Sequence, residues 1–177
     1  MKNYRTVINR AIAASYDRPV IFCLLGNPGA GKSTAAIYLA EMCGIPQFKS
    51  YTTRPKRLRF ESEYHFLTED EAKKILDTEE ILARTVYGGN IYFGLVEDVK
   101  PVQSYVIDPA GAEYLLKKHG NKYKIITVWI EGNNEVSVER SNRMFGAGDI
   151  NYNYIIHNAN LDELCIQLLK LTVNTII

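Results

Sequence analysis

The octapeptide GNPGAGKS, residues 26–33, lies directly between an apolar run and a helical pattern. The apolar run, residues 19–25, has the composition of a strand that is buried on both faces of a parallel sheet. The residues from Lys32 to about Cys43 have the pattern of the helix that follows such a strand. Because parallel strands need a crossover connection, usually a helix, this unit predicts an α/β fold.

The same octapeptide matches the phosphate-loop pattern G-x-x-x-x-G-K-[ST] at every fixed position. Glycines allow backbone N–H groups to turn around phosphate oxygens, and the N-terminus of the next helix adds partial positive charge. The lysine bridges the outer phosphates, and the hydroxyl after it binds Mg²⁺. A plain glycine turn rarely needs these two residues. We therefore predict that a nucleoside triphosphate is bound by Gly26, Asn27, Pro28, Gly29, Ala30, Gly31, Lys32, Ser33 and Thr34.

The rest of the chain continues the alternation of apolar strands with amphipathic helices. Strands are predicted at 81–86, 91–93, 102–107, 124–130 and 154–156. Helices are predicted at 3–15, 68–76, 109–119, 136–144 and after Asn160. Gly88-Gly89-Asn90 is predicted to be a hairpin turn, and Gly120 to be the C-terminal cap of its helix. No linker or repeat interrupts the pattern, so we expect a single domain over residues 1–177.

The composition supports one ordinary globular domain, with 177 residues, 46% hydrophobic residues and a net charge of +1. The balanced charge disfavours a polybasic protein that binds nucleic acid or a membrane surface. No apolar stretch approaches the ~20 residues of a membrane-spanning helix. The three cysteines are widely spaced, as buried thiols in a reducing compartment are, so we expect a cytoplasmic protein.

Five cations lie between Lys49 and Arg59, although the whole chain is nearly neutral. Arg54 and Arg57, flanked by hydroxyl residues and a tyrosine, have the chemistry to hold a dianionic phosphate by charge-assisted hydrogen bonds. Taken alone, the segment also fits a solvated basic loop. A nucleic-acid patch is a weaker alternative, because no run of aromatic residues is spaced to stack bases.

Six motifs occur in the order of the guanylate kinase family, which this chain resembles from about residue 19 to residue 169. After the phosphate loop come S-x-T-T-R-x-x-R at residues 50–57 and Y-x-F at residues 64–66. A turn similar to G-N-x-Y-x-G, the sequence I-D-x-x-G at residues 107–111 and Y-x-Y-I-I-x-N-x-x-L-D at residues 152–162 follow.

The resemblance implies a P-loop kinase fold: a mainly parallel central sheet flanked by helices, with a small subdomain that binds the nucleoside monophosphate (NMP). That subdomain would span about 47–95, and a short lid about 140–151. The implied reaction moves the γ-phosphoryl of ATP to GMP or dGMP with Mg²⁺. The implied acceptor-binding residues are Ser50, Arg54, Arg57, Tyr64 and Tyr92.

The resemblance also assigns residues to catalysis and to the ATP side of the site. Asp108 matches a carboxylate near the metal and the acceptor, which would contact Mg²⁺ through water, whereas Ser33 would bind the metal directly. Asn158 matches an asparagine close to the ATP base. The implied catalytic residues are Lys32, Asp108 and the candidate lid arginines Arg140 and Arg143.

Three departures from the family pattern concern the acceptor and the lid. Ala83 stands where the family has a glutamate that reads the guanine edge. In the family's Y-Y-G-[ST], this chain has Phe93 in place of a phosphate-binding tyrosine and Leu95 in place of a hydroxyl that contacts the base. Only about eight residues, 144–151, fill the lid interval, so Arg84 is a further candidate for a catalytic arginine.

These departures leave the acceptor open. GMP or dGMP fits the pattern, and so does another (deoxy)nucleoside monophosphate, because a base pocket without its polar partners discriminates poorly. Two alternatives remain: a sugar-phosphate kinase on the same fold, which needs no base reader, and a guanylate-kinase-like binding module without turnover.

Overall fold

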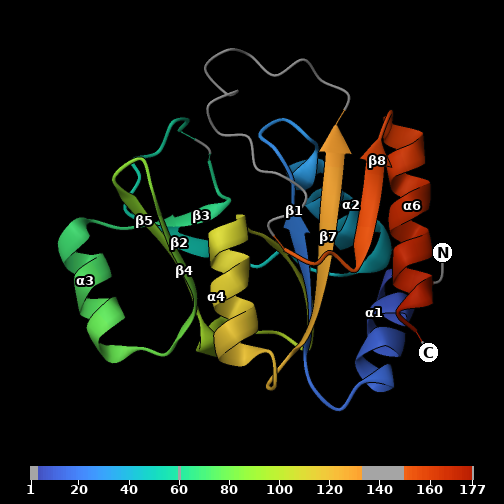
Figure 1. Ribbon diagram of the computed structural model, residues 1–177, viewed down its shortest axis with the longest axis horizontal. Coiled ribbons are helices and arrows are strands. Elements are labelled where there is room, and N and C mark those ends of the chain that lie inside the picture. The colour runs from blue at the N-terminus through green and yellow to red at the C-terminus, as the bar shows by residue number, and fades with distance from the viewer. Residues whose placement is uncertain (1–3, 60, 133–149, 177) are drawn as a thin grey trace.

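The central sheet contains four parallel strands in the order β6-β1-β7-β8 (Figure 1). The structure is a computed structural model that describes residues 4–59, 61–132 and 150–176. The strands are β1 (Val20–Leu25), β6 (Val102–Val106), β7 (Lys124–Gly132) and β8 (Tyr154–Asn158). The predicted α/β fold with a mainly parallel central sheet is thereby confirmed.

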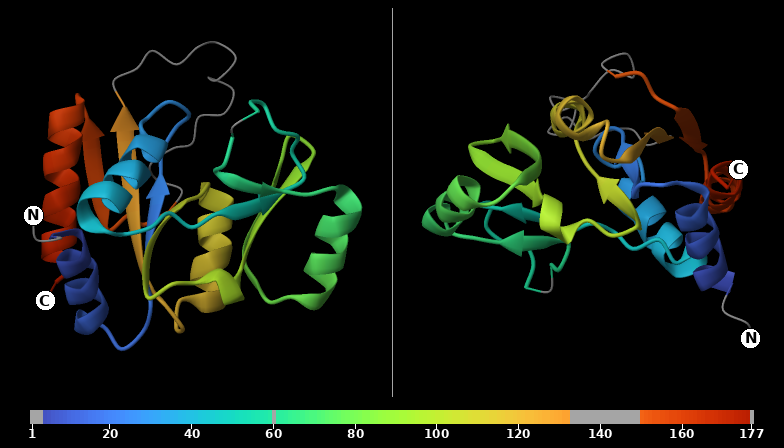
Figure 2. Two further views of the ribbon diagram at one scale, coloured as in Figure 1. Left: turned by 180° about the vertical axis from the view of Figure 1, so that it is seen from behind. Right: turned by 90° about the horizontal axis from the view of Figure 1, so that it is seen from below.

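Strand β1 is apolar throughout because both of its faces are covered. Val20, Phe22 and Leu24 belong to one buried cluster, with residues of α2 (Lys32–Cys43), α6 (Leu161–Asn174) and α1 (Tyr4–Ser15). The alternate residues of β1 belong to a second cluster, on the side of α4 (Pro109–His119). In Figure 1, α4 covers the near face, and the reverse view in Figure 2 shows α1 and α2 on the other.

A second sheet, in the order β3-β2-β5-β4, lies beside the central one (Figure 1). It consists of β2 (Ser50–Thr52), β3 (Tyr64–Phe66), β4 (Ile81–Tyr87) and β5 (Asn90–Leu95), and α3 (Glu69–Thr78) packs beside it. The short 3-10 helix η1 (Val96–Asp98) leads back to the central sheet. A capping box formed by Thr68 and Glu71 begins α3, and the predicted hairpin turn joins β4 to β5.

The two sheets are joined through α4, which packs against β4. His119, at the last position of α4, is buried, and its Nε2 lies 2.9 Å from the carbonyl oxygen of Ile81. Gly120 caps α4 as predicted, but its φ of −59° is right-handed. The left-handed glycine cap that we expected there is found instead at Gly44, after α2.

Two other expectations concern the cysteines and the region after β7. Cys23 and Cys43 are buried, Cys165 is half-buried, and all three are free thiols. No helix in the described part of the chain has both the length and the apolar character needed to span a bilayer. The helix predicted at 136–144 and most of the predicted lid, 140–149, lie outside the described residues.

Candidate functional site

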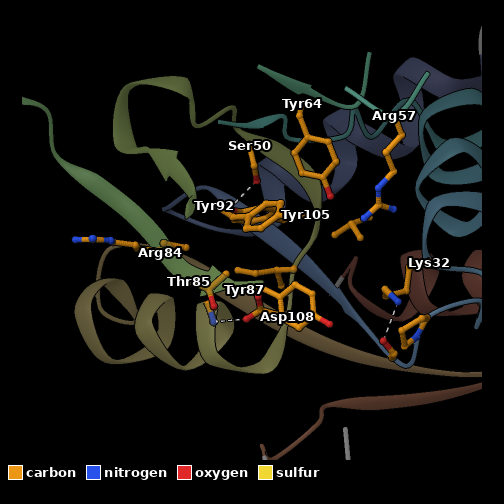
Figure 3. Close-up of a pocket in the computed structure, with 16 residues that line it drawn as sticks. Lys32, Ser50, Arg57, Tyr64, Arg84, Thr85, Tyr87, Tyr92, Tyr105 and Asp108 are labelled. Carbon is orange, nitrogen blue, oxygen red and sulfur yellow. Dashed lines mark hydrogen bonds between the residues drawn. The ribbon is translucent and has the colours of Figure 1, made fainter. Parts of the chain in front are cut away.

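A cavity of about 220 Å³ lies between the carboxyl ends of β1 and β6 and the second sheet. Side chains from both sheets line it, and Figure 3 shows them converging from different elements. It brings together eight residues that the sequence nominated, namely Gly26, Pro28, Lys32, Ser50, Arg57, Tyr64, Tyr92 and Asp108. The phosphate loop and part of the basic segment therefore face the same space.

The phosphate loop has a backbone that requires glycine at three positions. Gly26, Gly29 and Gly31 have φ values of 145°, 84° and 102°. The Nζ atom of Lys32 donates hydrogen bonds of 2.8 Å to the carbonyl oxygens of Gly26 and Asn27. Burial lowers the pKa of Lys32 to about 8. Ser33, in the first turn of α2, is exposed.

Neighbouring strands hold this loop in place. A Cβ atom at Gly26 would lie 2.3 Å from the carbonyl oxygen of Ile130 in β7. Asn158, at the end of β8, donates a hydrogen bond of 2.9 Å from Nδ2 to the carbonyl oxygen of Ala30. The same amide fills the space over Gly31. We expected Asn158 near the ATP base, and the structure shows that its amide nitrogen binds the loop backbone.

Replacing Gly26 with alanine is expected to destabilise the protein more than replacing Gly89. Both glycines have positive φ values, and such a conformation costs other residues about 1–3 kcal/mol. Only Gly26 adds a clash with backbone, which raises the cost by about another 1–3 kcal/mol. The free energy of unfolding in urea measures both, with Gly89→Ala as the matched control. Equal losses would show that the contact with Ile130 does not constrain the loop.

Arg54 does not line the cavity, although the sequence nominated it as a phosphate ligand. Its guanidinium forms a two-pronged ion pair with Glu61 and lies over the Tyr64 and Phe66 rings, 5.4 Å from each ring centroid. Glu61 also accepts a 2.9 Å hydrogen bond from the backbone N–H of Arg57. Hydrogen bonds from Arg54 and Arg57 lower the pKa of Glu61. Arg54 thus supports the cavity wall, whereas the side chain of Arg57 reaches the cavity itself.

The sequence analysis did not nominate Glu61. One signal was available, since Glu61 is the first acidic residue after five cations. A lone carboxylate in such a segment is a natural partner for a buried arginine, because an arginine is rarely fully buried without a pair.

Strand β5 places Tyr92 in the cavity, and Phe93 and Leu95 face the other way. Phe93 and Leu95 are buried with Ala72, and Phe93 stacks on Tyr51 with 5.3 Å between ring centroids. Successive residues of a strand point to opposite faces, so Phe93 and Leu95 cannot share the face of Tyr92. Phe93 and Leu95, the residues that depart from the family pattern, therefore do not line the cavity, whereas Tyr92 does.

Strand β4 contributes Ala83, Arg84, Thr85 and Tyr87 to the lining of the cavity. Ala83 is only 1% exposed and lines the cavity. The wall therefore has a methyl group, and no carboxylate, at the position that the sequence analysis singled out. Arg84 is exposed, and Figure 3 shows its side chain extending away from Lys32 and Arg57. The Arg84 side chain thus points away from the phosphate loop at this edge of the cavity (Figure 3). Arg140 and Arg143 lie outside the described residues.

Two side chains from β6 and the segment after it complete the site. Asp108 caps α4, since its Oδ1 accepts a 2.7 Å hydrogen bond from the backbone N–H of Gly111. Tyr105, which the sequence analysis missed, is 3% exposed and accepts a 3.1 Å hydrogen bond from the Ser50 hydroxyl. Burial raises the pKa of Tyr105. Its position near the carboxyl end of a parallel strand, three residues before Asp108, was the available signal.

Comparison with solved structures finds a guanylate kinase from Anaplasma phagocytophilum with a TM-score of 0.66. The two sequences are 21% identical, and the match covers 90% of this chain and 87% of the other. Neither the models of known protein families nor the curated proteins give a match. At this identity the likeness establishes the fold: the chain has a guanylate-kinase-like α/β fold.

Proposed function

We propose that this protein is a phosphotransferase that moves the γ-phosphoryl group of ATP to a nucleoside monophosphate, either GMP or dGMP or another (deoxy)nucleoside monophosphate. The observation that carries the proposal is the single cavity that has Lys32 of the phosphate loop at one end and Arg57, Tyr64 and Tyr92 at the other. A donor triphosphate and an acceptor phosphate held in this space would meet near Asp108. The guanylate-kinase-like fold supports the same reaction class.

The donor side fits a triphosphate with Mg²⁺. Lys32 caps the loop through two carbonyl oxygens, and its ammonium group can move from them to phosphate oxygens. Mg²⁺ is usually held by one or two protein groups together with phosphates and water. Ser33 and, through water, Asp108 would be the protein groups of such a site. Bound there, Mg²⁺ would neutralise charge on the β- and γ-phosphate oxygens.

The acceptor side supplies one exposed cation and two phenol hydroxyls. Arg57 would form charge-assisted hydrogen bonds to the acceptor phosphate, with Tyr64 and Tyr92 as neutral donors beside it. Arg54 would act indirectly, since its contact with Tyr64 fixes that ring. Positioning of this kind is the main contribution of a protein to phosphoryl transfer.

Three parts of the proposal rest on the sequence. Arg140 and Arg143 are the candidates for the arginine that stabilises the transferring phosphoryl, within a short lid at about 140–151. The second sheet would serve as the NMP-binding subdomain, about 47–95, of a single domain. The free, mostly buried thiols support a place in the cytoplasm.

Release of ADP in a coupled assay with Mg²⁺ tests the function. The panel contains all ribo- and deoxynucleoside monophosphates together with sugar phosphates, and we expect turnover with at least one nucleotide. Turnover with sugar phosphates alone would show that the acceptor is a sugar phosphate and not a nucleoside monophosphate. Thermal denaturation with and without Mg·ATP separates a kinase from a binding module, because only a protein that binds the nucleotide is stabilised by it. No turnover and no stabilisation would refute the proposal.

A further inference from the structure

The wall of the cavity opposite Lys32 contains aromatic rings and hydroxyl groups but no carboxylate among the described residues. Ala83, Thr85 and Tyr87 come from β4, Ser50 from β2 and Tyr105 from β6. Asp108 is the one carboxylate among the described lining residues, and one of its oxygens already caps α4. The two donor groups on the guanine edge, N1–H and the 2-amino group, therefore lack the paired acceptor that a carboxylate offers.

Tyr105 fills the space beside β5 where this wall would otherwise open. Its ring packs against Phe48 with 4.6 Å between centroids, and both residues are buried. A Cβ atom at Gly94 would lie 2.6 Å from the Phe48 ring and 3.1 Å from the Tyr105 hydroxyl. The Tyr105 hydroxyl is thereby held in the wall of the cavity.

The hydrogen bond between Ser50 and Tyr105 determines what the wall can recognise. The Ser50 hydroxyl donates to the Tyr105 oxygen, so the Tyr105 proton remains available to donate. Burial keeps this phenol protonated, because the pKa of Tyr105 is raised. The Tyr105 hydroxyl, acting as a donor, can form a hydrogen bond to a carbonyl oxygen of the base but not to an amino group, which is itself a donor.

We propose that the acceptor is a nucleoside monophosphate with a diketo pyrimidine base, uracil or thymine, and that Tyr105 is the specificity-determining residue. This inference rests on the proposed function and deepens it by naming the acceptor. The O4 atom of such a base is an acceptor, whereas cytosine carries an amino group at the same position. A site that leaves a buried polar group unpaired with the wrong ligand discriminates strongly against it.

The test compares kcat/KM for UMP, dTMP, CMP, GMP and AMP with the full chain and Mg·ATP. We expect the diketo pyrimidines to exceed the other acceptors by at least tenfold. Tyr105→Phe keeps the ring and removes the donor, so the ratio of UMP to CMP should fall about tenfold. Tyr123→Phe, at a buried tyrosine outside the cavity, is the control and should leave the ratio unchanged.

The ratio of the kcat/KM values for two acceptors does not depend on the overall activity of a variant, so each result can be interpreted. A merely structural role of Tyr105 would lower all acceptors equally and leave the ratio unchanged, which would refute its assignment. A preference for GMP, AMP or CMP would refute the diketo pyrimidine while the kinase proposal stands. If no nucleotide is turned over, the proposed function fails. Calorimetric binding of UMP and GMP then still tests the ranking, and tighter binding of GMP would overturn it.

Discussion

Replacing Lys32 with methionine is expected to lower kcat/KM for phosphoryl transfer by about 10²–10³-fold, the usual cost of removing one charge-stabilising group from an active site. Methionine keeps much of the length of the side chain and removes its charge. The Nζ atom that now bonds to Gly26 and Asn27 is the group that would neutralise the transferring phosphate. The coupled assay for ADP release measures the loss, and circular dichroism verifies that the variant is folded.

The same lysine predicts how nucleotide binding changes with pH. Burial lowers the pKa of Lys32 to about 8 in the free protein, and a bound phosphate would favour the charged form. The affinity for Mg·ATP is therefore expected to fall as the pH rises above about 8, by at most about tenfold per pH unit. Calorimetric titration from pH 7 to 9.5 measures this trend, and Lys32→Met should remove it. A wild-type affinity that does not change over this range would contradict the role of the lysine.

The stability of the free protein should respond in the opposite direction. The folded pKa of Lys32 lies below the ordinary value of 10.5, so the unfolded chain binds more protons between pH 8 and 10.5. The contribution of Lys32 to stability therefore rises with pH in this window. If stability rises with pH while the affinity for Mg·ATP falls over the same range, both effects can be assigned to Lys32.

The sequence predicted the fold well because its main signals are local and strongly constrained. A six-residue strand buried on both faces must be apolar at every position, as β1 is. The phosphate loop that follows β1 needs glycine where φ is positive, and the three glycines of the octapeptide occupy those positions. Such requirements are visible in one sequence without knowledge of any distant residue.

The details of the site were less visible because they depend on register and on long-range partners. A shift of one residue along β5 decides whether Phe93 or Tyr92 faces the cavity, and motif matching alone did not determine it. The sequence nominated Arg54 as a phosphate ligand, but its actual partner, Glu61, is determined by the fold of the loop between the two residues. Tyr105 comes from a different sheet than its partner Ser50, 55 residues away. No local pattern joins such a pair.

Replacing Arg57 with alanine is expected to lower kcat/KM for the acceptor by about 10–10²-fold, since a hydrogen bond to a charged group contributes about 1.5–3 kcal/mol. The KM for ATP should stay within about threefold of the wild-type value, because the phosphate loop lies at the other end of the cavity. Lys49→Ala is the matched control, as Lys49 is an exposed cation of the same basic segment that does not line the cavity. Initial rates with each substrate varied in turn measure both constants.

If Arg57→Ala and Lys49→Ala lower activity equally, the segment acts through its general charge and Arg57 has no specific contact with the acceptor. Raising the salt concentration separates the two cases further. An effect of general charge is screened within about 8–10 Å at physiological salt, whereas a direct contact in a cavity is screened much less. Loss of ATP binding in Lys32→Met and loss of acceptor binding in Arg57→Ala would together assign the two ends of the cavity to the two substrates. A binding module without turnover would show neither kinetic effect.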